Sequence, residues 1–157
     1  AKIKGIPNPK YPTQKESFSD NLPENSQLLI VESLLSNIEN TYKIDPNKRY
    51  IAGLSMGGMG TFELVARNPN YFAAGIAICG GANPNWAKFF KKTPLWIFHG
   101  MKDKVVPPEL SINMYDSIKN YNSESKLTLY ENVGHNSWDL AFKEVEIMNW
   151  LFSNKKK

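Results

Sequence analysis

From residue 49 onward, short apolar runs alternate with stretches of helical periodicity. Four strands are predicted from the apolar runs, at 49–54, 72–78, 95–98 and 126–130. Three helices are predicted between and after them, at about 57–67, 108–120 and 137–152. Strands separated by helices pair in parallel through right-handed crossovers. We therefore expect an α/β fold, a three-layer α/β/α arrangement around a mainly parallel sheet.

The N-terminal part of the chain is different in composition. Residues 1–23 are polar and rich in proline, which predicts an extended surface segment. A helix is predicted from about residue 24, with Asn25 or Ser26 as its N-cap, and it ends before the turn at 45–47. Because no repeat or second domain boundary is visible, we expect residues 1–157 to form a single domain. The chain starts at Ala1 without a signal peptide, so we expect it to be processed or excised from something longer.

Composition excludes several classes of protein. With 41% hydrophobic and 22% charged residues the chain is globular, and no apolar run reaches the ~18 residues of a membrane span. The net charge of +4 is mild and includes three C-terminal lysines, so no nucleic-acid groove is expected. The single cysteine, Cys79, excludes an internal disulfide but leaves secreted, periplasmic and cytoplasmic locations open.

The pentapeptide Gly53-Leu54-Ser55-Met56-Gly57 lies where a predicted strand ends and a predicted helix begins. A G-x-S-x-G sequence at such a junction is typical of a nucleophile elbow, in which the serine hydroxyl projects from a sharp turn. Small residues are needed on both sides of the serine, and glycines stand there. The backbone N–H of Met56 is then placed to stabilise negative charge near the serine. The alternative is a glycine-rich turn with a capping serine.

A serine nucleophile needs a base, and the chain has only two histidines. His135 lies in a loop between the last strand and the last helix, where α/β sheets place reactive groups, so we expect it to be the general base. His99 lies in an apolar run, and we interpret it as a hydrogen-bonded histidine that organises the neighbouring loop.

A carboxylate must orient the histidine, and Asp103 follows the third predicted strand. Its position gives the chain order Ser, Asp, His that α/β-hydrolases use. Asp116 is placed on a predicted helix and Asp139 at the start of another, where an acidic residue favours the helix dipole. The predicted catalytic residues are therefore Ser55, Asp103 and His135.

These motifs resemble those of α/β-hydrolase esterases, in the branch of carbohydrate esterases, polyhydroxybutyrate depolymerases and phospholipase-like carboxylesterases. The resemblance covers about residues 24–152, and its matching stretches are 44–50, 53–60, 77–81, 98–107, 134–139 and 150–151. It implies a shortened α/β-hydrolase fold and a serine esterase that needs neither cofactor nor metal, and no cluster of residues has metal-ligand spacing.

The chain departs from this family before the elbow. Family members carry earlier strands with a loop that supplies a second oxyanion N–H, often near an H-G-G string, and nothing in residues 1–48 matches it. The strand 49–54 would then be an edge strand, which invites pairing. Three outcomes are open: the segment 2–6 folds back as a strand, two copies form a homodimer through this edge, or the chain is part of a longer enzyme.

The sequence predicts a carboxylester hydrolase that acts on small or carbohydrate-linked esters through an acyl-enzyme. Trp86 and Trp138 are candidate substrate contacts, although each could instead pack on the core. Cys79 is interpreted as a small buried hydrophobic residue. The alternative function is a non-catalytic binding module on a hydrolase scaffold, because the oxyanion loop is missing. A peptidase is a weaker third interpretation, because it would need a gating domain that this sequence does not contain.

Overall fold

The computed structural model describes residues 19–22 and 27–156. The helices are α1 (Leu28–Thr41), α2 (Met56–Arg67), η1 (a 3₁₀ helix, Pro84–Phe90), α3 (Pro108–Ile118), α4 (Trp138–Ala141) and α5 (Ile147–Ser153). The strands are β1 (Tyr50–Leu54), β2 (Ala74–Ile78), β3 (Leu95–Gly100) and β4 (Lys126–Tyr130). They form one parallel sheet in the order β1-β2-β3-β4, which confirms the predicted α/β fold class.

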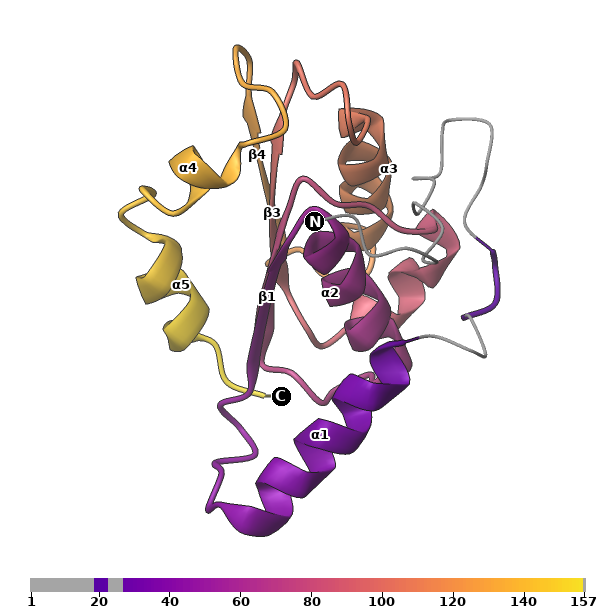
Figure 1. The fold of residues 1–157 in the computed structure, drawn as a ribbon, viewed down its shortest axis with the longest axis vertical. Helices are drawn as coiled ribbons and strands as arrows, with labels where there is room; N and C mark the ends of the chain where they lie inside the picture. The colour runs from indigo at the N-terminus through magenta and orange to yellow at the C-terminus, as the bar shows by residue number, and fades with distance from the viewer. Residues whose placement is uncertain (1–18, 23–26, 157) are drawn as a thin grey trace, which may run out of the picture.

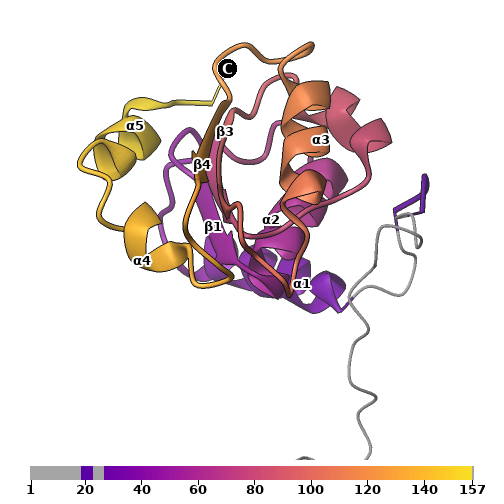
Figure 2. The ribbon, with the colours of Figure 1, turned by 90° about the horizontal axis from the view of Figure 1, so that it is seen from above.

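Helices cover both faces of the sheet (Figures 1 and 2). α2, η1 and α3 lie on one face, and α4 and α5 lie on the other. Side chains of successive strand residues point to opposite faces, so Ala77 and Ile97 join the core under α2 and α3, while Ile76, Ile78 and Phe98 join the core under α5. β2 and β3 are both buried along their whole length, and their residues are apolar except for His99 near the end of β3.

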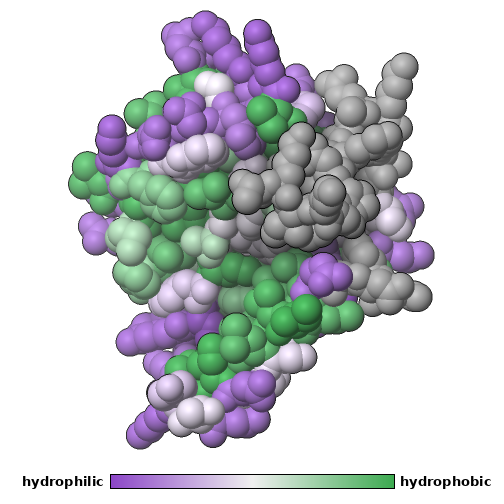
Figure 3. Space-filling model, viewed as in Figure 1, coloured by the Kyte–Doolittle hydropathy of each residue, from purple (hydrophilic) through white to green (hydrophobic). Residues whose placement is uncertain are grey.

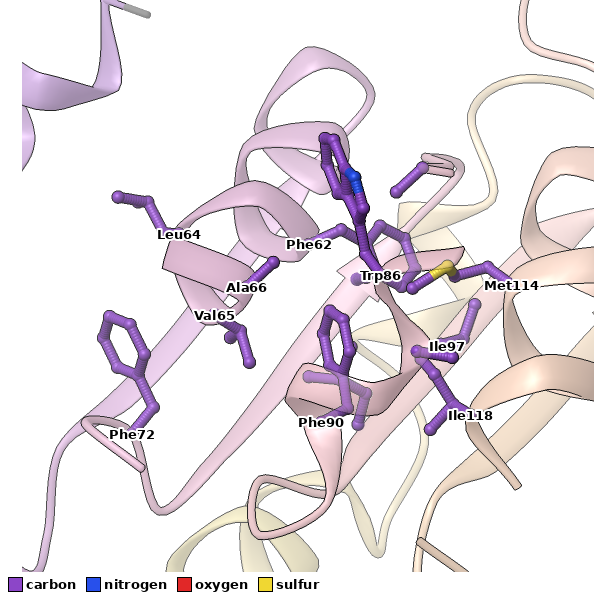
Figure 4. Close-up of a cluster of buried hydrophobic side chains, with 14 residues drawn as sticks. Phe62, Leu64, Val65, Ala66, Phe72, Trp86, Phe90, Ile97, Met114 and Ile118 are labelled. Carbon is purple, nitrogen blue, oxygen red and sulfur yellow. The ribbon is translucent and has the colours of Figure 1, made fainter. Parts of the chain in front are cut away.

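The larger of the two cores lies between the sheet and the α2–α3 layer (Figure 4). Phe62 and Val65 of α2, Phe90 of η1 and Met114 and Ile118 of α3 are each fully buried there. The aromatic rings of Phe62 and Phe90 meet edge to face at 6.1 Å. This core fixes α2, and through α2 it fixes the residue that precedes it, Ser55.

The predicted last helix is in fact two helices, and this prediction was wrong. After α4, the N–H groups of Lys143 and Glu144 bond the carbonyls three residues earlier, so the helix tightens and stops. The buried Ala141 and the buried Ile147 are six positions apart, and one continuous helix would turn them to different faces. The break brings Ala141, Ile147 and Leu151 onto the same core.

The start of α1 also differs from the prediction. Gln27 occupies the N-cap of α1 without a side-chain hydrogen bond, and the predicted caps Asn25 and Ser26 lie outside the described residues. Most of the predicted extended segment 1–23 lies outside them too. In the described part of it, Asp20 accepts hydrogen bonds from the side chains of Asn83 and Asn85. The single-domain organisation stays a prediction.

Among the described residues, β1 pairs only with β2 and is an edge strand of the sheet. Leu54, the last residue of β1, is 39% exposed. An apolar groove of about 390 Å³ lies beside β1, between α1 and α2. Figure 3 shows hydrophobic residues gathered over α1 on this side of the molecule, where Ile30 and Leu34 are exposed. The segment 2–6, predicted as one cover for this edge, lies outside the described residues.

Candidate active site

The predicted catalytic residues come together at one end of the sheet. Ser55 follows β1, Asp103 follows β3 and His135 follows β4. Since all strands are parallel, their carboxyl ends meet at the same edge of the sheet, although 80 residues separate Ser55 from His135. Each of the three residues lies in a connection after a strand, outside the regular hydrogen-bond ladders.

Ser55 occupies a strained turn between β1 and α2. Its φ of 55° lies in the left-handed region, which few residues other than glycine adopt, and it is the N-cap of α2. Its N–H donates to the Ile78 carbonyl at 2.9 Å, and its carbonyl accepts from the N–H of Met59 at 3.0 Å. These two bonds hold the turn from both sides, so the hydroxyl projects in a fixed direction.

The glycines around Ser55 have different roles. A Cβ at Gly53 would lie 2.1 Å from the Gly57 carbonyl oxygen and 2.8 Å from the Thr61 hydroxyl, so no larger residue fits. A Cβ at Gly57 would meet nothing within 4 Å among the described residues. The predicted need for a small residue therefore holds at Gly53, whereas Gly57 faces the open groove beside β1.

His135 lies between the hydroxyl and the carboxylate. Its Nε2 is 2.9 Å from Ser55 Oγ, and its Nδ1 is 2.7 Å from Asp103 Oδ2. A carboxylate oxygen can only accept, so Nδ1 carries the hydrogen and the Nε2 lone pair faces the serine hydroxyl. This is the arrangement in which an imidazole can take the serine proton.

Asp103 is buried, and both oxygens of its carboxylate accept hydrogen bonds. Oδ1 accepts from the N–H groups of Val105 and Val106 at 2.8 and 2.9 Å, while Oδ2 faces His135. Burial alone would raise the pKa of this carboxyl, but the hydrogen bonds from His135, Val106 and Val105 outweigh it and hold the pKa below its ordinary value. Asp103 is therefore ionised at neutral pH and can stabilise a protonated His135.

Met56 is the first residue of α2, so its N–H lies outside the intrahelical hydrogen-bond ladder. This N–H is adjacent to Ser55 and at the positive end of the helix dipole. Its side chain is 55% exposed and lines the groove beside β1. The backbone of Met56, rather than its side chain, is the chemically useful part.

Cys79 is buried directly beneath this site, at the end of β2. Its sulfur lies within 4.8 Å of ligand atoms of Asp103 and His135, the only such trio among the described residues. Burial raises the pKa of the thiol to about 11, so the sulfur is protonated at neutral pH and is a poor nucleophile. The geometry agrees with its interpretation as a buried hydrophobic residue.

The two candidate tryptophans lie in different surroundings. Trp86 is 3% exposed in the core under α2 and α3, and its indole N–H donates to the Asp20 carbonyl at 3.1 Å, which favours the core-packing alternative. Trp138 is half-buried, and its ring meets that of His135 edge to face at 5.5 Å. Trp138 is therefore the candidate that contacts the site.

His99 contacts the carboxylate of Asp103 directly, which its sequence context did not indicate. It is fully buried, and its Nε2 lies 3.2 Å from Asp103 Oδ2, the same oxygen that His135 contacts. On its other side Nδ1 lies 2.7 Å from Ser111 Oγ of α3. Sequence reasoning placed His99 beside the Asp103 loop but missed Ser111, because a serine on an amphipathic helix carries no pattern that marks it.

The fold and these contacts define an α/β-hydrolase. The chain matches the phospholipase/carboxylesterase family over residues 5–148, and it belongs to that family. Among the described residues, no helix is both long and apolar enough to span a membrane.

Three relatives illustrate the similarity. A thermostable esterase of known structure is 34% identical, with a TM-score of 0.78 over 82% of this chain and 36% of that chain. A bifunctional acetylxylan esterase/xylanase from Neocallimastix patriciarum is 34% identical over 77 residues, 48% of this chain and 11% of that protein. A variant of SOBER1 from Arabidopsis thaliana is 25% identical, with a TM-score of 0.64 over 85% of this chain and 70% of that chain. The chain thus spans about a third of the thermostable esterase and about a tenth of the bifunctional enzyme.

Proposed function

We propose that this chain is a serine carboxylester hydrolase in which Ser55, His135 and Asp103 form the catalytic triad. The observation that carries the proposal is the continuous chain of contacts from Ser55 Oγ to His135 Nε2 at 2.9 Å and from His135 Nδ1 to Asp103 Oδ2 at 2.7 Å. Membership of the phospholipase/carboxylesterase family supports the same activity.

The reaction begins with attack of Ser55 Oγ on the ester carbonyl carbon, while His135 Nε2 takes the hydroxyl proton. The carbonyl oxygen becomes negative, and the N–H of Met56 donates to it. Collapse of this intermediate breaks the bond to the alcohol oxygen, which receives the proton from His135. The acyl group is then bound to Ser55 as an ester.

Water completes the cycle. His135 takes a proton from the water as the water oxygen attacks the acyl carbon, and it returns that proton to Ser55 Oγ when the carboxylic acid leaves. Throughout, Asp103 remains ionised and stabilises the imidazolium form of His135. No redox change or cofactor is needed for this sequence of steps.

The test combines fluorophosphonate labelling with turnover of p-nitrophenyl acetate. We expect labelling at Ser55 alone, and a Ser55→Ala variant that loses labelling and at least about 10³-fold in kcat. Ser33→Ala, an exposed serine on α1, is the matched control and should behave as the wild type. Equal labelling and turnover in the wild type and in Ser55→Ala would overturn the proposal.

For the substrate, we propose small or carbohydrate-linked esters. The acetylxylan esterase/xylanase relative supports this class, and Trp138 beside His135 offers an aromatic ring on which a sugar or aryl group can pack. Acetate release from acetylated xylan should be measured in the wild type and in Trp138→Leu. We expect Trp138→Leu to have a higher KM for acetylated xylan than the wild type and an unchanged kcat for p-nitrophenyl acetate. Equal KM values for xylan in the two proteins would contradict a substrate contact.

For the assembly, we propose that two copies pair through the edge of β1. The support is an edge strand with an apolar groove beside it, since free strand edges pair readily with another strand. A strand that pairs with itself across a two-fold axis forms a closed dimer. Light scattering should give twice the mass of one chain, and hydrogen exchange should show β1 amides that lose protection on dilution. A monomer with protected β1 amides would overturn the dimer.

A further inference from the structure

We propose that His99 is a positioning residue of the esterase reaction, which fixes the Asp103 carboxylate in the orientation that His135 needs. The inference deepens the proposed function and rests on it. It is carried by the contacts of three buried groups: His99 on β3, Asp103 on the loop that follows β3, and Ser111 on α3.

The first observation is what the His99 ring faces. Its Nε2 lies 3.2 Å from Asp103 Oδ2 and 3.0 Å from the carbonyl oxygen of Val106. Both oxygens are acceptors, so Nε2 must carry a hydrogen that it shares between them. Because Asp103 Oδ2 also accepts from His135 Nδ1 at 2.7 Å, two imidazoles donate to one carboxylate oxygen.

The second observation is that the His99 ring is itself held in place. Nδ1 lies 2.7 Å from Ser111 Oγ, and that oxygen also lies 2.9 Å from the Gly80 carbonyl oxygen, so one hydroxyl joins the ring to the backbone that follows β2. Burial lowers the pKa of His99, which favours the neutral ring. The contact with Ser111 fixes the rotation of the ring, and the two acceptors that face Nε2 keep a hydrogen on that nitrogen.

The third observation concerns the loop that carries Asp103. The N–H groups of Val105 and Val106 hold Asp103 Oδ1, and the Val106 carbonyl is bound by the same His99 nitrogen that bonds Oδ2. His99 thus restrains the carboxylate and the backbone that orients it. No solvent reaches the side chains of His99 or Asp103, so water cannot replace a lost donor there without a rearrangement.

The test uses two substitutions that differ in the atom they preserve. In His99→Gln the amide N–H can occupy the place of Nε2 and still donate to Asp103 and Val106. In His99→Asn the shorter side chain reaches only the place of Nδ1 and leaves Asp103 Oδ2 without this donor. A role in stability alone would affect both variants, whereas a positioning role separates them.

We expect His99→Asn to lower kcat for p-nitrophenyl acetate by about tenfold or more with KM changed less than about twofold, because the orienting group is displaced and not the substrate site. His99→Gln should stay within about threefold of the wild-type kcat. Circular dichroism and thermal melting give the folded fraction for each variant. Equal kcat in folded His99→Asn and the wild type, or equal losses in both variants, would overturn the proposal.

Two further measurements keep the inference decisive. If His99→Asn does not fold, Ser111→Ala removes only the hydroxyl that fixes the ring, and a kcat equal to the wild type would overturn the proposal. NMR of the deshielded proton of His135 Nδ1–H reports on the Asp103 contact without any turnover. Its loss in His99→Asn and its retention in His99→Gln would support positioning even if Ser55 proved inert, so failure of the proposed function is distinguished from failure of this inference.

Discussion

Replacing Gly53 by alanine tests how tightly the turn around Ser55 is built. The added Cβ would lie 2.1 Å from the carbonyl oxygen and 2.3 Å from the carbonyl carbon of Gly57, where real Cβ contacts are essentially never under 3.0 Å. The obstacle is backbone, which cannot rotate away as a side chain can. The end of β1 and the first turn of α2 must therefore separate by about 1 Å.

The expected cost can be bounded. Overpacking of this kind destabilises proteins by about 1–3 kcal/mol, and the upper end applies here because the Thr61 hydroxyl oxygen, at 2.8 Å, is also too close to the added Cβ. For a domain of this size, about 3 kcal/mol lowers Tm by roughly 6–12 °C. A backbone shift of about 1 Å at Gly53, two positions before Ser55, should also lower kcat by around 10²-fold.

Urea denaturation and p-nitrophenyl acetate turnover measure these two effects. Gly57→Ala is the matched control, because its Cβ meets nothing among the described residues and alanine is favoured over glycine in helices by about 1 kcal/mol. We expect Gly57→Ala to be as stable as the wild type or slightly more stable. A Gly53→Ala variant with wild-type stability and turnover would refute the steric reasoning.

Two further predictions follow from the surroundings of Asp103 and His99. In Asp103→Asn, the N–H groups of Val105 and Val106 require oxygen at the place of Oδ1, so the amide nitrogen faces His135 and forces the His135 hydrogen onto Nε2. We expect kcat to fall by roughly 10⁴-fold, and an unchanged kcat would contradict the assigned tautomer. Acidification should also destabilise the protein: burial lowers the pKa of His99 in the folded state, so below its unfolded pKa of about 6.5 the unfolded chain binds a proton that the folded chain does not. The contribution of His99 to the free energy of unfolding should therefore be constant above about pH 6.5 and fall below it by up to about 1.4 kcal/mol per pH unit. The free energy of unfolding of His99→Gln should fall less steeply with acidification. Urea titrations at several pH values check this, and equal slopes for the two proteins would contradict it.

Much of the fold was predictable because the strands are buried on both faces. β2 and residues 95–98 of β3 show as uninterrupted apolar runs, and β4 was predicted with the bounds that the structure has. The break between α4 and α5 was not predictable from periodicity, since Phe142 and Val145 continue an apolar pattern although both are exposed. The 3₁₀ helix η1 was also missed, because its bonds span three residues and leave no helical period of 3.6.

The site was predictable to the extent that chemistry and chain order restrict it. With two histidines in the chain, loop position distinguished His135 from His99, and the contact of His135 with both Ser55 and Asp103 agrees with that choice. The fixed orientation of His99 depends on Ser111, which lies 12 residues away and is brought close only by the packing of α3. Such a contact is a product of tertiary structure and has no local signal.

Helix α1 is the element that we expect to detach first when this molecule begins to unfold. None of its residues is buried, although Val31 and Leu35 pack on the core beneath α2. Polar contacts also hold it, since Asn68 donates to Glu32 and Tyr71 donates to Glu39. Segments with few buried groups detach at a free energy far below that of global unfolding. A transient departure of α1 would widen the groove next to Met56 while the sheet and the triad stay intact. Mild heating should thus loosen the surroundings of Ser55 before it disturbs the contacts between Ser55, His135 and Asp103.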